Sequence, residues 1–108
     1  MGSLSVISWR DIPSQVVAKR GRVTAKRLLS ARFQEAVDRA AMRAGRTGSA
    51  AYIADWTRSP VRPCGDDLEA EAQAEADRLE ARYSDDDLLR LVRAHGVDAA
   101  KAPGPEGA

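Results

Sequence analysis

The chain has 108 residues, enough for one domain, and its net charge at pH 7 is +1. Hydrophobic residues make up 44% of it but aromatic residues only 5%, so we expect a modest, alanine-rich core that is largely helical. No apolar run approaches the length of a membrane span, and the first residues lack the basic and apolar regions of a secretory signal. A single cysteine excludes an internal disulfide, which agrees with a cytoplasmic protein.

Three strands are predicted in the first part of the chain. β-Branched and aromatic residues fill Leu4–Trp9, and Pro13, which has no N–H group, is expected to end the extended run there. Gln15–Lys19 and Val23–Leu28 are the second and third predicted strands. A turn at Gly21 joins them, because glycine tolerates positive φ. The pattern indicates an antiparallel meander.

Residues 31–45 carry the strongest helical pattern. Apolar side chains recur at i, i+3, i+4, i+7, i+8 and i+11, which is one face of an α-helix: Phe33, Ala36, Val37, Ala40, Ala41 and Ala44. Ser30 is expected to cap this helix by accepting a backbone N–H, and Gly45 to end it in the left-handed conformation. Because four of the six face positions are alanine, a neighbouring element must pack close to the helix backbone. We expect this helix to lie on one face of the meander.

A second helix is predicted over residues 49–58. It places Tyr52, Ile53 and Trp56 on one face, and the prolines that follow bring it to an end. Residues 59–65 are then the expected linker between the two parts of the chain.

Two more helices are predicted, over residues 66–83 and 85–95. Asp66 and Glu69 have the spacing of a capping box at the start of the first. Ser84 precedes the second, whose first turn holds three aspartates, where the helix dipole favours them. His95 is expected on the inner face of the second helix.

These elements predict one α+β domain over residues 1–96, with its strands within 3–29. Residues 16–29 also contain enough Ala, Lys and Arg to be partly helical instead. Residues 97–108, with two prolines and two glycines, have the composition of a disordered tail.

The residue types that carry catalysis or bind metal are sparse. Asp85–Asp87 do not alternate as calcium ligands do and have no closing glutamate. His95 is the only histidine, and structural zinc sites avoid carboxylates as their main ligands. Cys64 has two aspartates beside it, which oppose formation of a thiolate, and no neighbouring base. With no catalytic motif in the chain, we expect no enzyme activity, no metal and no cofactor.

Charge is divided unequally along the chain. Residues 1–47 hold ten Lys and Arg against three acidic residues, whereas residues 48–108 hold seven against thirteen. One interpretation is that the halves face each other or are simply solvated. The other is that the basic half binds an acidic partner or nucleic acid.

The best binding candidate is the basic hairpin, by which we mean the turn around Gly21 with its cations. Such a hairpin can follow phosphates without reading sequence, although the chain has few aromatic residues for base stacking. Trp9 could add an apolar anchor if it is exposed, and the arginine beside it a planar donor for carboxylates. The alternative is that Trp9 is a core residue, which is the more common place for a tryptophan. The candidate binding residues are Trp9, Arg10, Asp11, Lys19, Arg20, Arg22, Lys26 and Arg27.

Several segments together resemble a known family. Residues 7–16 (ISWRDIPSQV), Gly21-Arg22, residues 32–42 (RFQEAVDRAAM) and Ala51-Tyr52 with Trp56 look like the small bacterial "virulence factor" domain, which is also similar to the C-terminal domain of conserved virulence factor C. The resemblance implies no reaction and no catalytic residues. Relatives in alphaproteobacteria lie beside genes for folate and corrinoid methyl transfer, which implies an accessory role for a one-carbon enzyme.

We therefore expect a non-catalytic cytoplasmic protein that docks on a larger protein. The alternative is a protein that binds nucleic acid or phosphate through the basic hairpin. No membrane partner is expected.

Overall fold

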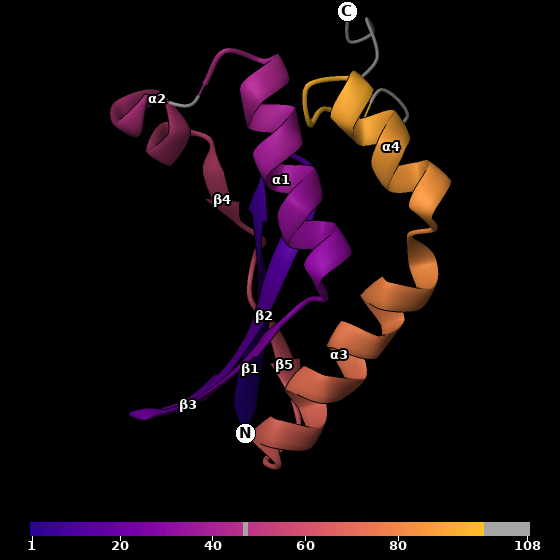
Figure 1. The fold of residues 1–108 in the computed structure, drawn as a ribbon. Helices are drawn as coiled ribbons and strands as arrows, with labels where there is room; N and C mark the ends of the chain where they lie inside the picture. The colour runs from indigo at the N-terminus through magenta and orange to yellow at the C-terminus, as the bar shows by residue number, and fades with distance from the viewer. Residues whose placement is uncertain (47, 99–108) are drawn as a thin grey trace, which may run out of the picture.

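The computed structural model describes residues 1–46 and 48–98, which form a five-stranded antiparallel sheet and four helices (Figure 1). The predicted α+β class is confirmed, and most of the predicted tail, residues 99–108, lies outside the described residues. In chain order the elements are β1 (Gly2–Trp9), β2 (Ile12–Arg20), β3 (Val23–Leu28), α1 (Ala31–Arg43), α2 (Ser49–Ala54), β4 (Trp56–Arg58), β5 (Arg62–Cys64), α3 (Leu68–Arg82) and α4 (Asp85–Arg93).

The sheet has the order β3-β2-β1-β4, with β5 also paired to β1. The first three strands form the predicted meander, and residues 16–29 are strand rather than helix. Pro13 does not end a strand: the chain turns at Arg10-Asp11, and β2 already begins at Ile12. Ser8 pairs with Pro13 after Ile7 has paired with Gln15, so the register shifts here. A bulge is one of the few places where a sheet accepts proline.

Strands β4 and β5 correct two predictions. Trp56 was expected in a helix and Arg62–Cys64 in a linker, yet β4 pairs with the end of β1 and β5 with its beginning. Helix α2 accordingly ends at Ala54. Three-residue strands are too short to show a hydrophobic period, and the hydrogen bonds that define them come from β1, more than 45 residues away.

Helix α1 has the predicted inner face. Five of its six positions are buried and the sixth, Ala44, is half-buried. Gly45 has φ +68°, as expected for the residue after the helix. Ser30 does not cap the helix with its side chain; its hydroxyl donates to Glu80 Oε1 at 2.9 Å instead. Ser30 therefore joins α1 to the end of α3.

Helices α3 and α4 complete the core. α3 packs along β2 and β3, and α4 packs against α1 (Figure 1). Asp67, one residue later than predicted, caps α3 by accepting the N–H of Ala70 at 3.2 Å. Helix α4 follows Ser84 and has three aspartates in its first turn, as expected, and Ser84 forms a capping box with Asp87 that was not predicted. No helix in residues 1–46 and 48–98 is long and apolar enough to cross a membrane.

The residues after α4 correct one further prediction. His95 is exposed rather than on the inner face, because its backbone has φ +61° and turns out of the helix. Gly96 follows with φ +87° and is buried against the ring of Trp9. The chain therefore leaves α4 toward the end of β1.

Candidate interaction surface

Trp9 lies in the interior of the protein. Its side chain is 0% exposed, stacks on Tyr52 with ring centroids 6.1 Å apart, and donates from Nε1 to the Tyr52 carbonyl at 3.1 Å. Burial raises the pKa of the Tyr52 hydroxyl, and the charge of Asp38 adds to this effect. Trp9 cannot serve as an exposed anchor for a partner, which corrects that part of the candidate site.

Arg10 is held by two other segments of the chain and by the ring of its neighbour Trp9. The backbone of Arg10 has φ +53°, which is uncommon for any residue other than glycine. Its backbone N–H donates to the Asp55 carbonyl at 2.9 Å. Its guanidinium donates to the His95 carbonyl at 2.9 Å and to Asp55 Oδ2 at 3.3 Å, and lies 4.9 Å from the centre of a Trp9 ring. A hydrogen bond from Arg46, together with the charges of Arg10 and Arg46, lowers the pKa of Asp55.

Asp11 completes this turn. Its N–H donates to the Gly96 carbonyl at 2.8 Å, and its carboxylate accepts the N–H of Asp98 at 2.7 Å. Trp9, Arg10 and Asp11 therefore fasten the segment after α4 and the end of α2 to the sheet. We call these three residues the Trp9 turn.

Replacing Arg10 with alanine is expected to lower the free energy of unfolding by about 1–3 kcal/mol, the cost of leaving charge-assisted hydrogen bonds unmade. Arg10→Gly is the control, since glycine accepts the positive φ without strain and should cost less than Arg10→Ala. Urea unfolding followed by circular dichroism measures both. If neither variant loses stability, the turn is not a structural clamp and Arg10 returns to the binding candidates.

The basic hairpin lies at the other end of the sheet. Trp9 pairs with Ile12 at one end of the β1–β2 ladder, and Ser3 pairs with Lys19 at the other. Gly21 has the expected positive φ, +58°, and the hairpin projects at the lower left of Figure 1. The Trp9 turn and the basic hairpin are therefore two separate places, where the sequence had suggested one surface.

The acidic half of the chain covers part of the hairpin. Arg27 forms an ion pair with Glu69 and donates to Gln73 at 3.0 Å, and Arg20 lies 3.7 Å from Asp66. All three of these partners lie on α3 or directly before it. The interpretation that the two halves face each other holds for these two arginines.

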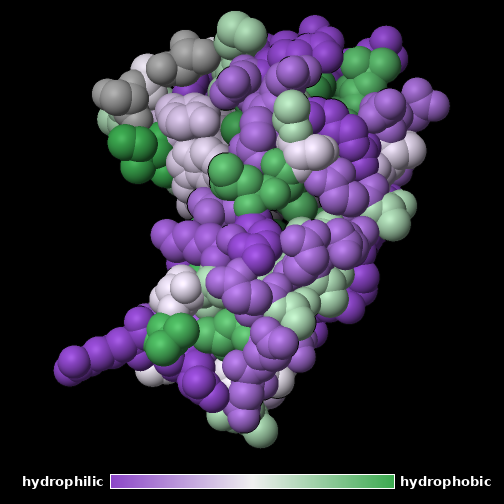
Figure 2. Space-filling model, turned by 60° about the horizontal axis from the view of Figure 1, so that its bottom comes forward, coloured by the Kyte–Doolittle hydropathy of each residue, from purple (hydrophilic) through white to green (hydrophobic). Residues whose placement is uncertain are grey.

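Three cations of the hairpin stay outside this pairing. Lys19, Arg22 and Lys26 are exposed, and none has an ion pair or side-chain hydrogen bond within residues 1–46 and 48–98. Two apolar side chains of the same hairpin are also exposed: Leu28 (70%), on the face of the sheet that carries Lys19 and Lys26, and Val23 (56%), on the opposite face next to the turn. In Figure 2 a hydrophilic arm projects at the lower left, and hydrophobic residues adjoin its base. We define the docking surface as these five residues.

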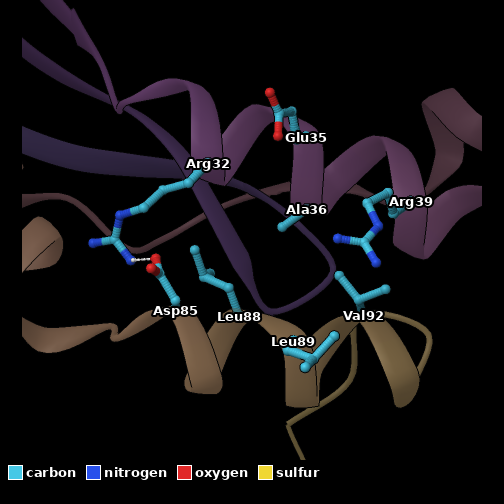
Figure 3. Close-up of a pocket in the computed structure, with 8 residues that line it drawn as sticks. All are labelled: Arg32, Glu35, Ala36, Arg39, Asp85, Leu88, Leu89 and Val92. Atoms are coloured by element: carbon cyan, nitrogen blue, oxygen red, sulfur yellow. Dashed lines mark hydrogen bonds and ion pairs between the residues drawn. The ribbon is translucent and has the colours of Figure 1, made fainter.

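A shallow groove between α1 and α4 is a second feature, which sequence reasoning missed. Its volume is about 260 Å³, with Arg32 and Arg39 at its ends and apolar residues between them (Figure 3). Arg32 binds Asp85 at 3.3 Å and the Glu80 carbonyl at 2.6 Å, so one cation of the groove is engaged by the protein. The pairing of two helices makes this groove, and no local sequence pattern reports it.

Among the described residues no group of three or more His, Cys, Asp or Glu side chains is arranged so that it could hold a metal ion. Cys64 is half-buried, and burial raises the pKa of its thiol, with the charge of Glu71 acting in the same direction. The Cys64 side chain is thus held as a neutral thiol.

The fold and its surface define a small α+β protein whose Trp9 turn is engaged by other segments of the chain and whose β2–β3 hairpin is basic and exposed. The family model described as "Virulence factor" matches residues 7–92, from β1 to α4. The chain belongs to the virulence factor family, as the resemblance of its sequence indicated. Comparison with curated proteins found no match, and comparison with solved structures found none either.

Proposed function

We propose that this protein is a non-catalytic interaction protein that docks on an acidic surface of a larger protein. The observation that supports this is the docking surface, where the side chains of Lys19, Arg22 and Lys26 have no ion pair with any residue that the structure describes, while Arg20 and Arg27 are paired with acidic residues. Exposed charges steer and orient a partner. Leu28 on the same face and Val23 on the opposite face of the hairpin supply apolar area to bury.

A protein partner fits this surface better than nucleic acid. Affinity for a phosphate backbone grows with the number of phosphates that lysine and arginine neutralise, and among the described residues the hairpin offers three cations without an ion pair. The acidic residues of α3 run beside the hairpin and would repel a phosphate chain that passed it. The exposed side chains of Val23 and Leu28 gain no favourable contact from a phosphate backbone, whereas a protein surface could bury them.

The family supplies the first partners to test. Folate and corrinoid one-carbon enzymes are the candidates that the gene neighbourhood of relatives implies, and an accessory protein in the cytoplasm is the role we propose. To complement the docking surface, such an enzyme would need an acidic patch with apolar residues beside it.

Reversing two charges of the docking surface tests the proposal. We expect Lys19→Glu with Lys26→Glu to weaken partner binding about tenfold or more, since like charges then meet across the interface. The measurement is capture of partners from nuclease-treated lysate of the native host at moderate salt, quantified by mass spectrometry. The unfolding midpoint should stay close to that of the wild type, because both side chains are exposed.

The control variant is Arg39→Glu with Arg43→Glu, which makes the same change in net charge on the exposed side of α1. It should keep the partner. Equal binding by both double variants would contradict docking through the hairpin. If only nucleic acid, from lysate without nuclease, depends on Lys19 and Lys26, the hairpin binds phosphate instead.

A further inference from the structure

We propose that the acidic partner contributes an extended segment that joins the sheet as a new strand beside β3. This inference rests on the proposed function and specifies how the docking surface is used. β3 is the last strand in the order β3-β2-β1-β4 and pairs only with β2 within the described residues. Extended peptides commonly bind proteins by adding to such an edge.

The turn before β3 determines which backbone groups lie at the open edge. Arg20 pairs with Val23 across the two residues Gly21 and Arg22, and Gly21 has φ +58°, as is typical of a type II′ turn. From that closing pair, hydrogen-bonded and non-hydrogen-bonded pairs alternate along the ladder. The N–H and C=O groups of Thr24, Lys26 and Leu28 therefore point away from β2.

One contact agrees with this assignment. The Lys26 carbonyl accepts a hydrogen bond from the Arg27 guanidinium at 2.9 Å. A carbonyl engaged in the β2–β3 ladder would have its partner on β2, so this oxygen faces the open edge. An incoming strand would displace this one side-chain donor, and would otherwise meet backbone groups that pair with no other strand of the described chain.

The charges beside this edge select an acidic segment. Thr24, Lys26 and Leu28 share one face of the sheet with Lys19 and, across β1, with Arg58. None of the strand residues that share this face is acidic. Acidic side chains on this side of an incoming strand would meet Lys26 directly and Lys19 behind it.

The other face of the sheet, which carries Arg27 and Val23, disfavours acidic side chains on an incoming strand. There Arg27 already pairs with Glu69 of α3, and further acidic residues of α3 lie along the helix. A carboxylate of the incoming strand on this side would be repelled, whereas an apolar residue could cover the exposed side chain of Val23. The edge therefore favours a segment in which acidic and apolar residues alternate.

A second copy of this chain is a poor occupant for the same reason. Antiparallel pairing of β3 with its own copy would bring Lys26 and Arg27 of both copies close together. Like charges directly opposite each other destabilise a sheet, and lysine on an edge strand is a common means of preventing such pairing. An acidic segment removes this repulsion.

The test uses a fluorescein-labelled ten-residue peptide in which glutamate and valine alternate. Its control is a peptide of the same composition with five glutamates followed by five valines. We expect saturable binding of the alternating peptide by fluorescence anisotropy, and binding at least tenfold weaker for the control. Thr24→Pro removes only an outward N–H and should weaken binding about tenfold, whereas Thr24→Ala should bind as the wild type does.

Amide hydrogen exchange supplies a readout that does not depend on variants. Bound peptide should slow exchange at Thr24, Lys26 and Leu28 about tenfold, while Val23 and Ala25, already bonded to β2, should change little. Absence of peptide binding, or equal binding by Thr24→Pro and Thr24→Ala, overturns strand addition. If Lys19→Glu with Lys26→Glu still loses the partner from lysate, docking through the hairpin stands without it. A wild-type dimer that Thr24→Pro converts to a monomer would make a second copy the occupant and overturn the proposal.

Discussion

Replacing Trp9 with alanine is expected to lower the free energy of unfolding by about 3–5 kcal/mol. Trp9 is fully buried, stacks on Tyr52 and donates its indole N–H to a backbone carbonyl. The variant leaves a cavity and also leaves the Tyr52 carbonyl without this donor. Because a domain has only about 5–15 kcal/mol of stability in total, this one substitution should remove a large part of it.

Urea unfolding followed by far-ultraviolet circular dichroism measures this loss. Trp56→Ala is the matched control, because Trp56 is only half-buried and contacts Tyr52 edge to face at 5.8 Å. We expect Trp56→Ala to cost about 1 kcal/mol, in proportion to the smaller area it buries. Equal losses for the two variants would contradict the central position of Trp9 in the core.

The sequence predicted the elements whose signals are local. The inner face of α1 repeats with the period of a helix, and five of its six residues are buried. Val23–Leu28 has the predicted bounds of β3, since Gly21 marks the turn before it. The capping box of Ser84 and Asp87 fixes the start of α4 through contacts three residues apart.

The features that sequence analysis did not predict depend on contacts between residues far apart in the chain. The ring of Trp9 is covered by Tyr52, 43 residues later, and by Gly96, 87 residues later. No period in residues 4–9 reports either contact. The sequence therefore left open whether Trp9 is exposed and could anchor a partner, and the structure shows that it is buried. Strands β4 and β5 were not predicted because they have no sequence pattern of their own. Pairing with β1 keeps them extended.

The candidate site divides in the same way. That the hairpin is basic can be read from the sequence. Which of its cations form ion pairs depends on α3, because Glu69 forms an ion pair with Arg27 and Gln73 accepts a hydrogen bond from it. Whether β3 has an open edge depends on the order of the whole sheet. A surface of this kind becomes visible only when elements far apart in the chain are placed together.

Gly96→Ala should cost about 2–5 kcal/mol, the second large effect we expect from a single substitution. Gly96 has φ +87° and is buried. A left-handed backbone costs an alanine about 1–2 kcal/mol, and a Cβ at this position would lie 2.8 Å from Trp9 Cζ3. Overpacking of that kind adds about 1–3 kcal/mol, because Trp9 is enclosed and the ring has little room to move.

Gly45→Ala separates the two contributions. Gly45 has φ +68°, yet a Cβ there would meet no atom within 4 Å, so this variant should lose only the conformational part. The contact itself is measured by a double-mutant cycle in which Trp9→Phe removes part of the larger ring. We expect Gly96→Ala to cost about 1 kcal/mol less in the Trp9→Phe background, with Gly45→Ala unchanged. A cost of Gly96→Ala that is equal in both backgrounds would assign the whole effect to backbone conformation and would leave the ring of Trp9 free to adjust.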